Sequence, residues 1–225
     1  MTVKSGAAAR PAAKRQQKQS TDNTRDKILD AAETLFGDRT FDTVSLRDIT
    51  QQADVTLALA SYHFGTKERL FAEVVGRRAH ILNQMRRERL AAIEADGRLD
   101  TRSIVDAFMH PLFEQMASGL PGWSSYLLIL AQLGQTNRWL HLLHENFDDT
   151  AELFLSKLEP ALPAVSRPLL MRGFSMVLVA MLQTLSRNRR LDALSGGAVT
   201  ADDLDAAYDV LLQFVVKGLE GLGEA

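Results

Sequence analysis

The stretch from Thr24 to Phe71 constrains the fold of this chain more than any other part. Apolar residues recur in it at helical spacing, and start and stop signals divide the pattern into short helices. The first helix follows the sequence TDNT and ends at Gly37. A second helix begins at Ser45, with Asp48 three residues later as an acidic variant of the capping box. The pattern therefore predicts two helices before residue 54.

A third and a fourth helix follow after a tight turn. Thr56 caps the third helix, which continues through Tyr62, and Gly65 breaks the chain before the fourth helix starts at Lys67. Two short helices that are joined by a turn and braced by another helix make a helix-turn-helix. The second helix of such a pair fits the major groove of DNA, so the stretch predicts a DNA-binding domain.

The same stretch resembles the DNA-binding domain of the tetracycline-repressor (TetR) family of bacterial transcription regulators. The resemblance is strong over about the first third of the chain and rests on helical architecture alone beyond it. The matching positions are Thr24, Arg25, Ile28, Leu29, Ala31, Ala32, Leu35, Phe36, Phe41, Ser45, Leu46, Arg47, Asp48, Ile49, Ala53, Val55, Tyr62, His63, Phe64, Lys67, Glu68, Leu70 and Phe71. The resemblance implies a homodimeric, cytoplasmic bacterial regulator that acts on double-stranded DNA with a palindromic operator.

The resemblance also implies which residues face DNA. We expect Tyr62, His63 and Lys67 to contact phosphates, whereas the third helix reads bases. Few side chains there can form bidentate hydrogen bonds with guanine, so thymine-methyl contacts, DNA shape and backbone contacts should matter more. Arg47 can equally pair with a nearby aspartate. The full predicted DNA-binding set is Arg25, Thr43, Ser45, Thr56, Leu57, Ala58, Ser61, Tyr62, His63 and Lys67.

The charge distribution agrees with a nucleic-acid-facing N-terminal part. Residues 1–100 carry 17 Lys+Arg and 14 Asp+Glu, whereas residues 101–225 carry 9 and 14. Residues 1–22 contain almost no bulky apolar groups, so we predict a flexible basic arm that either follows the DNA backbone or stays a solvated tail. The predicted division is this arm, a DNA-binding domain over 23–71 and a ligand-binding and dimerisation domain over 72–225.

The rest of the chain predicts only helices, so the fold class is all-α. A long helix over 67–95 joins the DNA-binding domain to a helical bundle, and its Arg-rich side (Arg77, Arg78, Arg86, Arg87 and Arg89) is interpreted mainly as a solvated face. Further helices are expected at about 101–118, 122–134, 138–158, 165–189 and 201–222, with Pro111 kinking or splitting the first of these. No apolar run approaches the ~20 residues that span a membrane, and without cysteine there is neither a disulfide nor a thiolate metal site.

The last two helices are apolar on more than one side, which predicts burial against both their own domain and a partner. By resemblance they form a four-helix dimer interface across a two-fold axis. A fully buried central helix in a monomer is the alternative. The predicted dimer residues are Leu170, Val177, Leu211, Phe214, Val215 and Leu219.

A small apolar or amphipathic effector is expected inside the bundle, because Met and aromatic side chains are spread over the helices that would enclose it. The predicted lining is Met109, Phe113, Met116, Trp123, Tyr126, Leu130, Phe147, Phe174 and Met181. Candidates to orient a polar group are Gln132, Asn137, Arg138, His141 and Arg172. The segment LALASYHFGTKERLF resembles a subgroup of the family in which some members answer to fatty acids or acyl-CoA thioesters.

Other function classes fit the residues less well. His141, His144 and Glu145 share a helix face, but no second pair completes a metal site, so we expect no metal and no cofactor. Neither a nucleophile elbow nor a phosphate-binding loop occurs, which argues against an enzyme. The alternatives to a ligand-released repressor are an activator or effector-independent DNA-binding protein, and a helical small-molecule carrier or enzyme.

Overall fold

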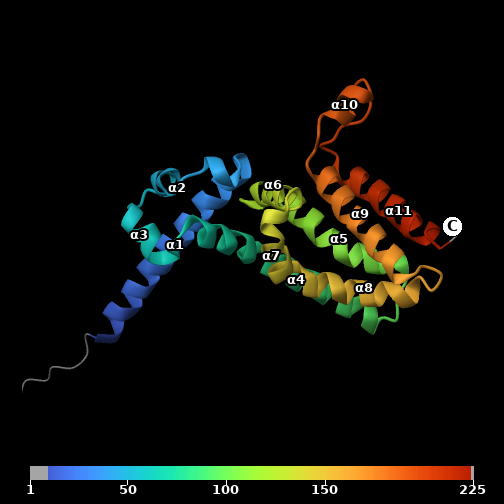
Figure 1. Cartoon of the computed structure of the whole chain (residues 1–225), viewed down its shortest axis with the longest axis horizontal. Coiled ribbons are helices and arrows are strands. Elements are labelled where there is room, and N and C mark those ends of the chain that lie inside the picture. Colours follow the sequence, from blue (N-terminus) through green and yellow to red (C-terminus); the bar gives the residue numbers. More distant parts are fainter. Residues whose placement is uncertain (1–9, 224–225) are drawn as a thin grey trace, which may run out of the picture. The chain divides into compact units, whose positions relative to one another are not determined.

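The computed structural model describes the backbone of residues 10–223 and the side chains of residues 23–223. Every regular element in this part of the chain is helical, which confirms the all-α fold class (Figure 1). The chain divides into two compact units, one up to Val74 and one from Val75 onward. The elements are α1 (Arg10–Asp38), a 3-10 turn (Phe41–Thr43), α2 (Leu46–Gln52), α3 (Leu57–Phe64), α4 (Lys67–Ala95), α5 (Thr101–Ala117), α6 (Trp123–Leu133), a second 3-10 turn (Asn137–Trp139), α7 (Leu140–Leu143), a π-helix (His144–Asp148), α8 (Asp149–Ala161), α9 (Arg167–Leu185), α10 (Arg190–Leu194) and α11 (Leu204–Gly221).

The first helix starts earlier than the sequence pattern predicts. We expected it after the sequence TDNT, but α1 begins at Arg10. Residues 10–22 are rich in Ala, Lys, Arg and Gln, which have high helix propensity although they offer no apolar stripe. The remainder of the predicted arm, residues 1–9, lies outside the described residues, and its flexibility stays a prediction.

An aromatic cluster anchors the first unit. Phe36 stacks on Phe41, and Phe71 meets both rings edge-on, with ring centroids 5.0–5.7 Å apart. Ile49 from α2 and Phe64 from α3 are also fully buried. The helix-turn-helix is thereby fixed to α1 and to the start of α4 by apolar packing.

In the second unit α5, α8, α9 and α11 pack against one another, and α9 lies beside α11 (Figure 1). At Gly173 of α9 a Cβ atom would stand 2.7 Å from side-chain atoms of Leu219 and of Leu222, so the glycine allows close helix approach. Phe108 of α5 packs edge-on against Phe154 and Phe174. These contacts form the core of the bundle.

Four features of the helices differ from the sequence prediction. Pro111 does not split α5, which is continuous from Thr101 to Ala117, and its ring is buried in the bundle. The proline removes only one backbone hydrogen bond of the helix, and a kink at this position stays a prediction. Pro160, which follows the predicted helix end at residue 158, lies in the last turn of α8. The predicted helix over 138–158 is divided by a π-helix at His144–Asp148, and α10 was not predicted.

The prediction that no apolar run is long enough to span a membrane is wrong for α9. This helix has 19 residues with a mean hydropathy of 1.5 over its most apolar window, of which 33% is buried. A core helix of a water-soluble protein has the same length and composition, so the observation alone is weak evidence for a membrane span. Most of this window is not buried, so α9 keeps apolar side chains such as Met176 and Val179 on the surface of the second unit.

The N-cap of α5 yields a pH-dependent prediction. The Asp100 carboxylate accepts hydrogen bonds from the Ser103 backbone N–H at 2.8 Å and from its hydroxyl at 3.0 Å, and the former does most to lower the pKa of Asp100. The native state holds this proton less tightly than the unfolded chain does. The charged carboxylate therefore stabilises the fold above the ordinary Asp pKa, about 3.9, and this stabilisation is lost as pH falls through the lowered pKa.

We expect Asp100→Ala to lower the free energy of unfolding by about 1 kcal/mol at neutral pH. Urea unfolding of wild type, Asp100→Ala and Asp100→Asn from about pH 3 to about pH 7 measures this. A pH-independent difference between wild type and Asp100→Asn would contradict it.

Candidate DNA-binding surface and ligand cavity

The start of α2 is fixed by a reciprocal capping box, as the sequence predicted. The Asp48 backbone N–H donates to Ser45 Oγ at 3.2 Å, and the Ser45 backbone N–H donates to Asp48 Oδ2 at 2.8 Å. The hydrogen bond from the Ser45 hydroxyl is the main cause that lowers the pKa of Asp48. Ser45 is thus occupied by the cap, although it remains exposed.

The turn before α3 has a left-handed residue, Asp54, with φ 53°. Thr56 then caps α3 by accepting a hydrogen bond from the Leu59 backbone N–H at 3.4 Å. At the other end Gly65, with φ 73°, adopts a conformation that residues with a Cβ rarely take. The helix between them, Leu57–Phe64, is therefore about two turns long.

One face of α3 is buried and the other is exposed. Ala60 and Phe64 are buried and hold the helix on the first unit. The other side exposes Ala58, Ser61 and Tyr62, the last with 79% of its surface accessible. Leu57 and Leu59 are exposed at 42% and 40%, so Leu59 does not belong to the core, whereas Ala60 does. This surface is available for base contacts and carries no carboxylate.

Two of the predicted phosphate-binding cations make contacts within the protein. Lys67 Nζ donates to the backbone oxygens of Phe41 at 2.9 Å and Val44 at 2.8 Å and lies 4.2 Å from the Phe41 ring centroid. Arg25 forms an ion pair with Glu73, and its guanidinium lies over the Phe64 ring. Through these contacts Lys67 and Arg25 stabilise the first unit.

Two other predicted DNA-binding residues also have contacts within the protein. The Thr43 hydroxyl donates a hydrogen bond to the Thr40 backbone oxygen, and His63 is half-buried beside Tyr62.

Replacing Lys67 with methionine should therefore reduce stability rather than remove a DNA contact. Losing two hydrogen bonds from a charged donor is expected to lower the free energy of unfolding by about 2 kcal/mol. The slope of log Kd for duplex DNA against log salt concentration should not change at a temperature where the variant is folded. Thermal unfolding and salt-titrated fluorescence anisotropy measure the two effects, with the exposed neighbour Arg69→Met as control. A normal melting temperature with a slope reduced by about 1 would identify a phosphate contact instead.

The second unit contains an apolar cavity of about 320 Å³ that is partly open to solvent, since the exposed Val179 lies on its wall. This volume lies near the lower end of the roughly 300–1,000 Å³ that is usual for ligand sites. Side chains from α4 to α9 form its walls. They are Leu82, Arg86, Phe108, Leu112, Leu130, Gly134, Leu143, Phe147, Asp148, Ala151, Ser175, Leu178, Val179, Met181 and Leu182.

Three predicted lining residues, Leu130, Phe147 and Met181, contribute to this cavity. Phe113 instead lines a separate hollow between α5 and α11. The other predicted residues pack in the core without lining the cavity. They are Met109, Met116, Trp123, Tyr126 and Phe174. The proposed polar candidates, Gln132, Asn137, Arg138, His141 and Arg172, do not line it either.

Arg86 does not lie on the solvated face that the sequence predicts for it. It is 4% exposed and lies on the wall of the cavity. Helical periodicity contained the signal, because position 86 is four residues from both Leu82 and Leu90, which are buried on the same stripe.

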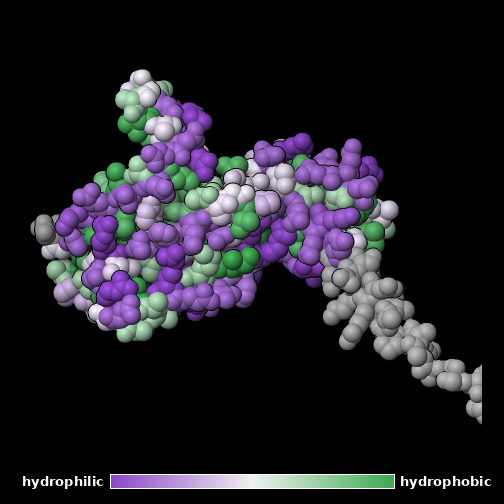
Figure 2. All heavy atoms as spheres, turned by 180° about the vertical axis from the view of Figure 1, so that it is seen from behind, coloured by the Kyte–Doolittle hydropathy of each residue, from purple (hydrophilic) through white to green (hydrophobic). Residues whose placement is uncertain are grey.

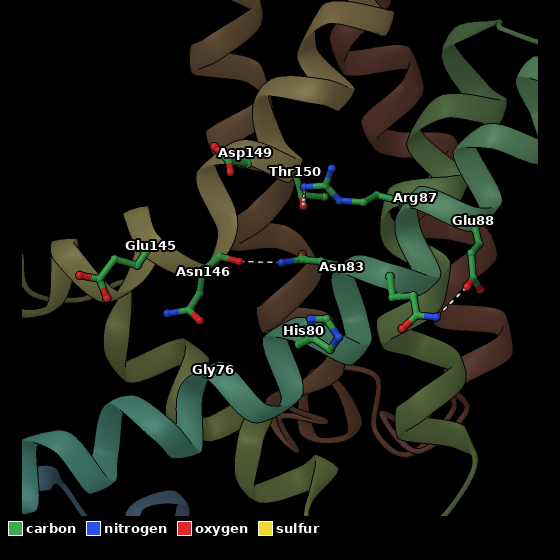
Figure 3. Close-up of a pocket in the computed structure, with 10 residues that line it drawn as sticks. Gly76, His80, Asn83, Arg87, Glu88, Glu145, Asn146, Asp149 and Thr150 are labelled. Carbon is green, nitrogen blue, oxygen red and sulfur yellow. Dashed lines mark hydrogen bonds between the residues drawn. The ribbon is translucent and has the colours of Figure 1, made fainter.

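A polar cleft of about 470 Å³ lies where α4 meets the π-helix and α8 (Figure 3). Asn83 points from α4 towards Asn146, and its amide donates to the Asn146 backbone oxygen at 2.6 Å (Figure 3). Arg87 donates to Thr150 Oγ1 at 3.0 Å. These hydrogen bonds join α4 to the segment whose other side, at Phe147 and Ala151, lines the apolar cavity.

The predicted dimer residues require correction. Leu170, Val177, Leu211, Val215 and Leu219 are buried within their own unit, because they form the stripe that packs α9 and α11 on the bundle. Of the predicted set Phe214 is exposed, at 71%. Figure 2 shows hydrophobic side chains in separate patches among hydrophilic ones on one face of the molecule. The exposed apolar residues of α9 and α11 are Leu169, Met171, Met176, Val179, Val210 and Phe214.

Comparison with known protein families matches both units. Residues 28–74 match the bacterial regulatory proteins of the tetR family, and residues 106–218 match the tetracyclin repressor-like C-terminal domain. The curated HTH-type transcriptional regulator BetI of Agrobacterium fabrum is 26% identical over 140 residues, which are 60% of this chain and 65% of BetI. The chain thus spans about two thirds of the length of that relative.

Solved structures share the fold at low sequence identity. The fatty acid degradation regulator FadR of Bacillus halodurans is 14% identical with a TM-score of 0.61, over 86% of this chain and 98% of FadR. A TetR-like transcriptional regulator of Rhodococcus sp. RHA1 is 19% identical with a TM-score of 0.56, over 88% of this chain and 96% of its own. A transcriptional regulator of Saccharomonospora viridis, solved in complex with choline, is 16% identical with a TM-score of 0.53, over 85% of this chain and 94% of its own.

Proposed function

Because the chain belongs to the tetracycline-repressor family of bacterial transcriptional regulators, we propose that it is a homodimeric repressor that a small amphipathic molecule releases from a palindromic operator. Its helix-turn-helix is a DNA-binding domain, and the family consists of regulators rather than enzymes. The proposed place of action is the bacterial cytoplasm, on DNA.

The observation that carries the proposal is the exposed face of α3. Its two buried residues hold the helix in place, while Ala58, Ser61 and Tyr62 are free to enter a major groove. Leu57 and Ala58 suit thymine methyl groups, and Ser61 can donate or accept a hydrogen bond at a base edge. Sequence readout by this face would depend on methyl contacts and DNA shape more than on bidentate hydrogen bonds.

A second copy of the chain is the proposed partner for α9 and α11. These helices pack side by side, and both retain exposed apolar side chains, with Met176 at 69% and Phe214 at 71%. Such residues on neighbouring helices favour an isologous interface, in which the same surface meets its own copy. A two-fold axis would present two α3 helices to a palindromic site.

The cavity of the second unit is the proposed effector site. α4 contributes Leu82 and Arg86 to its wall and also contributes Lys67 and Leu70 to the DNA-binding unit. A ligand that binds better to one position of α4 shifts the population of DNA-binding dimers by its difference in affinity. A small molecule, choline, is present in the solved structure of the Saccharomonospora viridis regulator.

Fluorescence anisotropy tests this function. Purified protein is titrated into labelled duplexes that cover the DNA flanking its own gene, at low salt and in the presence of competitor DNA. We expect saturable binding with a Kd below about 10⁻⁷ M, and weaker binding after a small molecule that copurifies with the protein is added back. Binding no tighter to these duplexes than to unrelated DNA would contradict the proposal.

A further inference from the structure

Arg86 is a buried cation in an apolar cavity. Among the residues whose side chains the structure describes, it is the one basic side chain that is buried. Leu82, Phe108 and Leu112 are among the apolar residues that line the same cavity. Placing a charge in such surroundings is unfavourable unless an opposite charge or several hydrogen bonds compensate.

The compensation within the protein is partial. Arg86 Nε donates to the Phe108 backbone oxygen at 2.9 Å, and the guanidinium carbon lies 3.9 Å from the Phe108 ring centroid. A guanidinium has five N–H donors, and this contact uses one of them. Over the described residues, no hydrogen bond involves its two terminal nitrogens and no carboxylate forms an ion pair with it. The remaining donors therefore lack a protein acceptor at the cavity wall.

The carboxylate of Asp148 does not neutralise this charge. Asp148 also lines the cavity, but its carboxylate accepts a hydrogen bond from His144 Nδ1 at 2.9 Å, and its side chain is 60% exposed. Burial lowers the pKa of Arg86 to about 9, opposed by Tyr126 alone, so the guanidinium still carries its charge at neutral pH. The cavity consequently has a positive charge on an otherwise mostly aliphatic and aromatic wall.

We propose that the cavity selects an amphipathic monoanion, whose carboxylate or equivalent oxyanion pairs with Arg86 while its apolar body fills the remaining space. The inference rests on the proposed function in taking this cavity as the effector site, and it adds the charge of the effector. A carboxylate matches the planar donors of a guanidinium in two parallel hydrogen bonds. The apolar walls supply affinity, and the ion pair supplies selectivity.

The proposed anion site would distinguish this chain from the Saccharomonospora viridis regulator, which was solved in complex with choline. Choline is a cation, and a cation placed beside Arg86 would add a second uncompensated positive charge to an apolar site. We expect choline not to bind in the cavity. Neutral molecules with the same apolar body should bind more weakly than the anion, because they leave the guanidinium unpaired.

Isothermal titration calorimetry with the full-length protein tests the charge preference. The probes are a series of straight-chain carboxylates from hexanoate to dodecanoate, the corresponding alcohols, and choline. For the best chain length we expect the carboxylate to bind roughly 10- to 100-fold more tightly than the alcohol, as one charged hydrogen-bonded pair provides. Equal affinity of acid and alcohol, preferential binding of choline, or no binding by any carboxylate would overturn the proposal.

Variants separate the ion pair from the packing. Arg86→Met replaces the guanidinium with an apolar side chain of similar length. It should remove the preference for carboxylate over alcohol, while the affinity for alcohol changes little. Arg86→Lys should retain part of the preference, because lysine keeps the positive charge but lacks the two parallel N–H donors of the guanidinium. Arg87→Met is the matched control on the same helix, since Arg87 faces the polar cleft and bonds Thr150 there. An unchanged preference in Arg86→Met, with a normal melting curve, would contradict the assignment.

A DNA-release assay distinguishes this inference from the proposed function. If the carboxylate binds in an Arg86-dependent manner but never releases DNA, the anion site stands and the repressor mechanism fails. If DNA is released only by neutral or cationic molecules, the repressor mechanism stands and the anion site fails.

Discussion

Replacing Ala58 with glutamate is expected to abolish duplex DNA binding while the fold stays intact. Ala58 is exposed on the face of α3 that is free to enter the major groove, so a glutamate there meets the negative charge of DNA. Like-charge juxtaposition at an interface costs several kcal/mol, which corresponds to at least a roughly 100-fold loss of affinity. Fluorescence anisotropy measures the loss, and circular dichroism checks the helix content.

The matched control is Ala92→Glu. Ala92 is another exposed alanine in a helix, but it lies on α4 in the second unit. The same change of side chain there should leave the affinity within about twofold once the salt concentration is held constant, because an exposed charge beyond a Debye length is largely screened. Equal losses of DNA affinity in both variants, or no loss in Ala58→Glu, would contradict the assignment of α3 as the helix that contacts bases.

Replacing Phe214 with glutamate is expected to convert dimers into monomers. Phe214 is 71% exposed on α11, and in the proposed interface its ring is buried against the second copy. Removing an aromatic residue that is buried in an interface costs about 2 kcal/mol or more, and burying a glutamate there in both copies adds to this. We expect the dimer dissociation constant to rise by at least roughly 100-fold. We also expect the affinity of the protein for a palindromic duplex to fall, because each half-site must then be bound by a separate monomer.

Sedimentation velocity over a range of protein concentrations measures the change in assembly. Leu120→Glu is the control, because Leu120 is also an exposed apolar residue, at 57%, but lies in the loop between α5 and α6. If Phe214→Glu sediments like the wild type at every concentration, α11 is not part of the interface.

Local signals explain why much of the fold is predictable from the sequence. The capping box at Ser45 and Asp48, the Thr56 cap and the break at Gly65 all involve residues close together in the chain. Such short-range patterns give the short helices and their order. The early start of α1 was missed because helix propensity without an apolar stripe gives no periodic signal.

Contacts between distant residues could not be predicted from the sequence. Lys67 carries an obvious positive charge, but its hydrogen-bond partners lie 23 and 26 residues earlier, at Val44 and Phe41, and only the folded unit brings them together. For a similar reason the sequence could not separate the buried from the exposed residues among the predicted dimer contacts. α9 and α11 have apolar residues on two sides, and the pattern cannot tell which side packs on the bundle, so Leu211 was chosen together with Phe214.

Arg86 is a different kind of error. Its position on the stripe of Leu82 and Leu90 was visible in the sequence, but a charged side chain is usually assigned to solvent. When a charged residue breaks an otherwise apolar stripe, it is a candidate for a binding group.

The central claim is that a two-fold pair of α3 helices reads double-stranded DNA. Selection of bound duplexes from a random library by the purified protein, followed by sequencing, tests it most directly. We predict enrichment of an inverted repeat whose half-site centres lie one helical turn, about 34 Å, or a multiple of it apart. Enrichment of a single unrepeated half-site, or of no sequence at all, would contradict the claim.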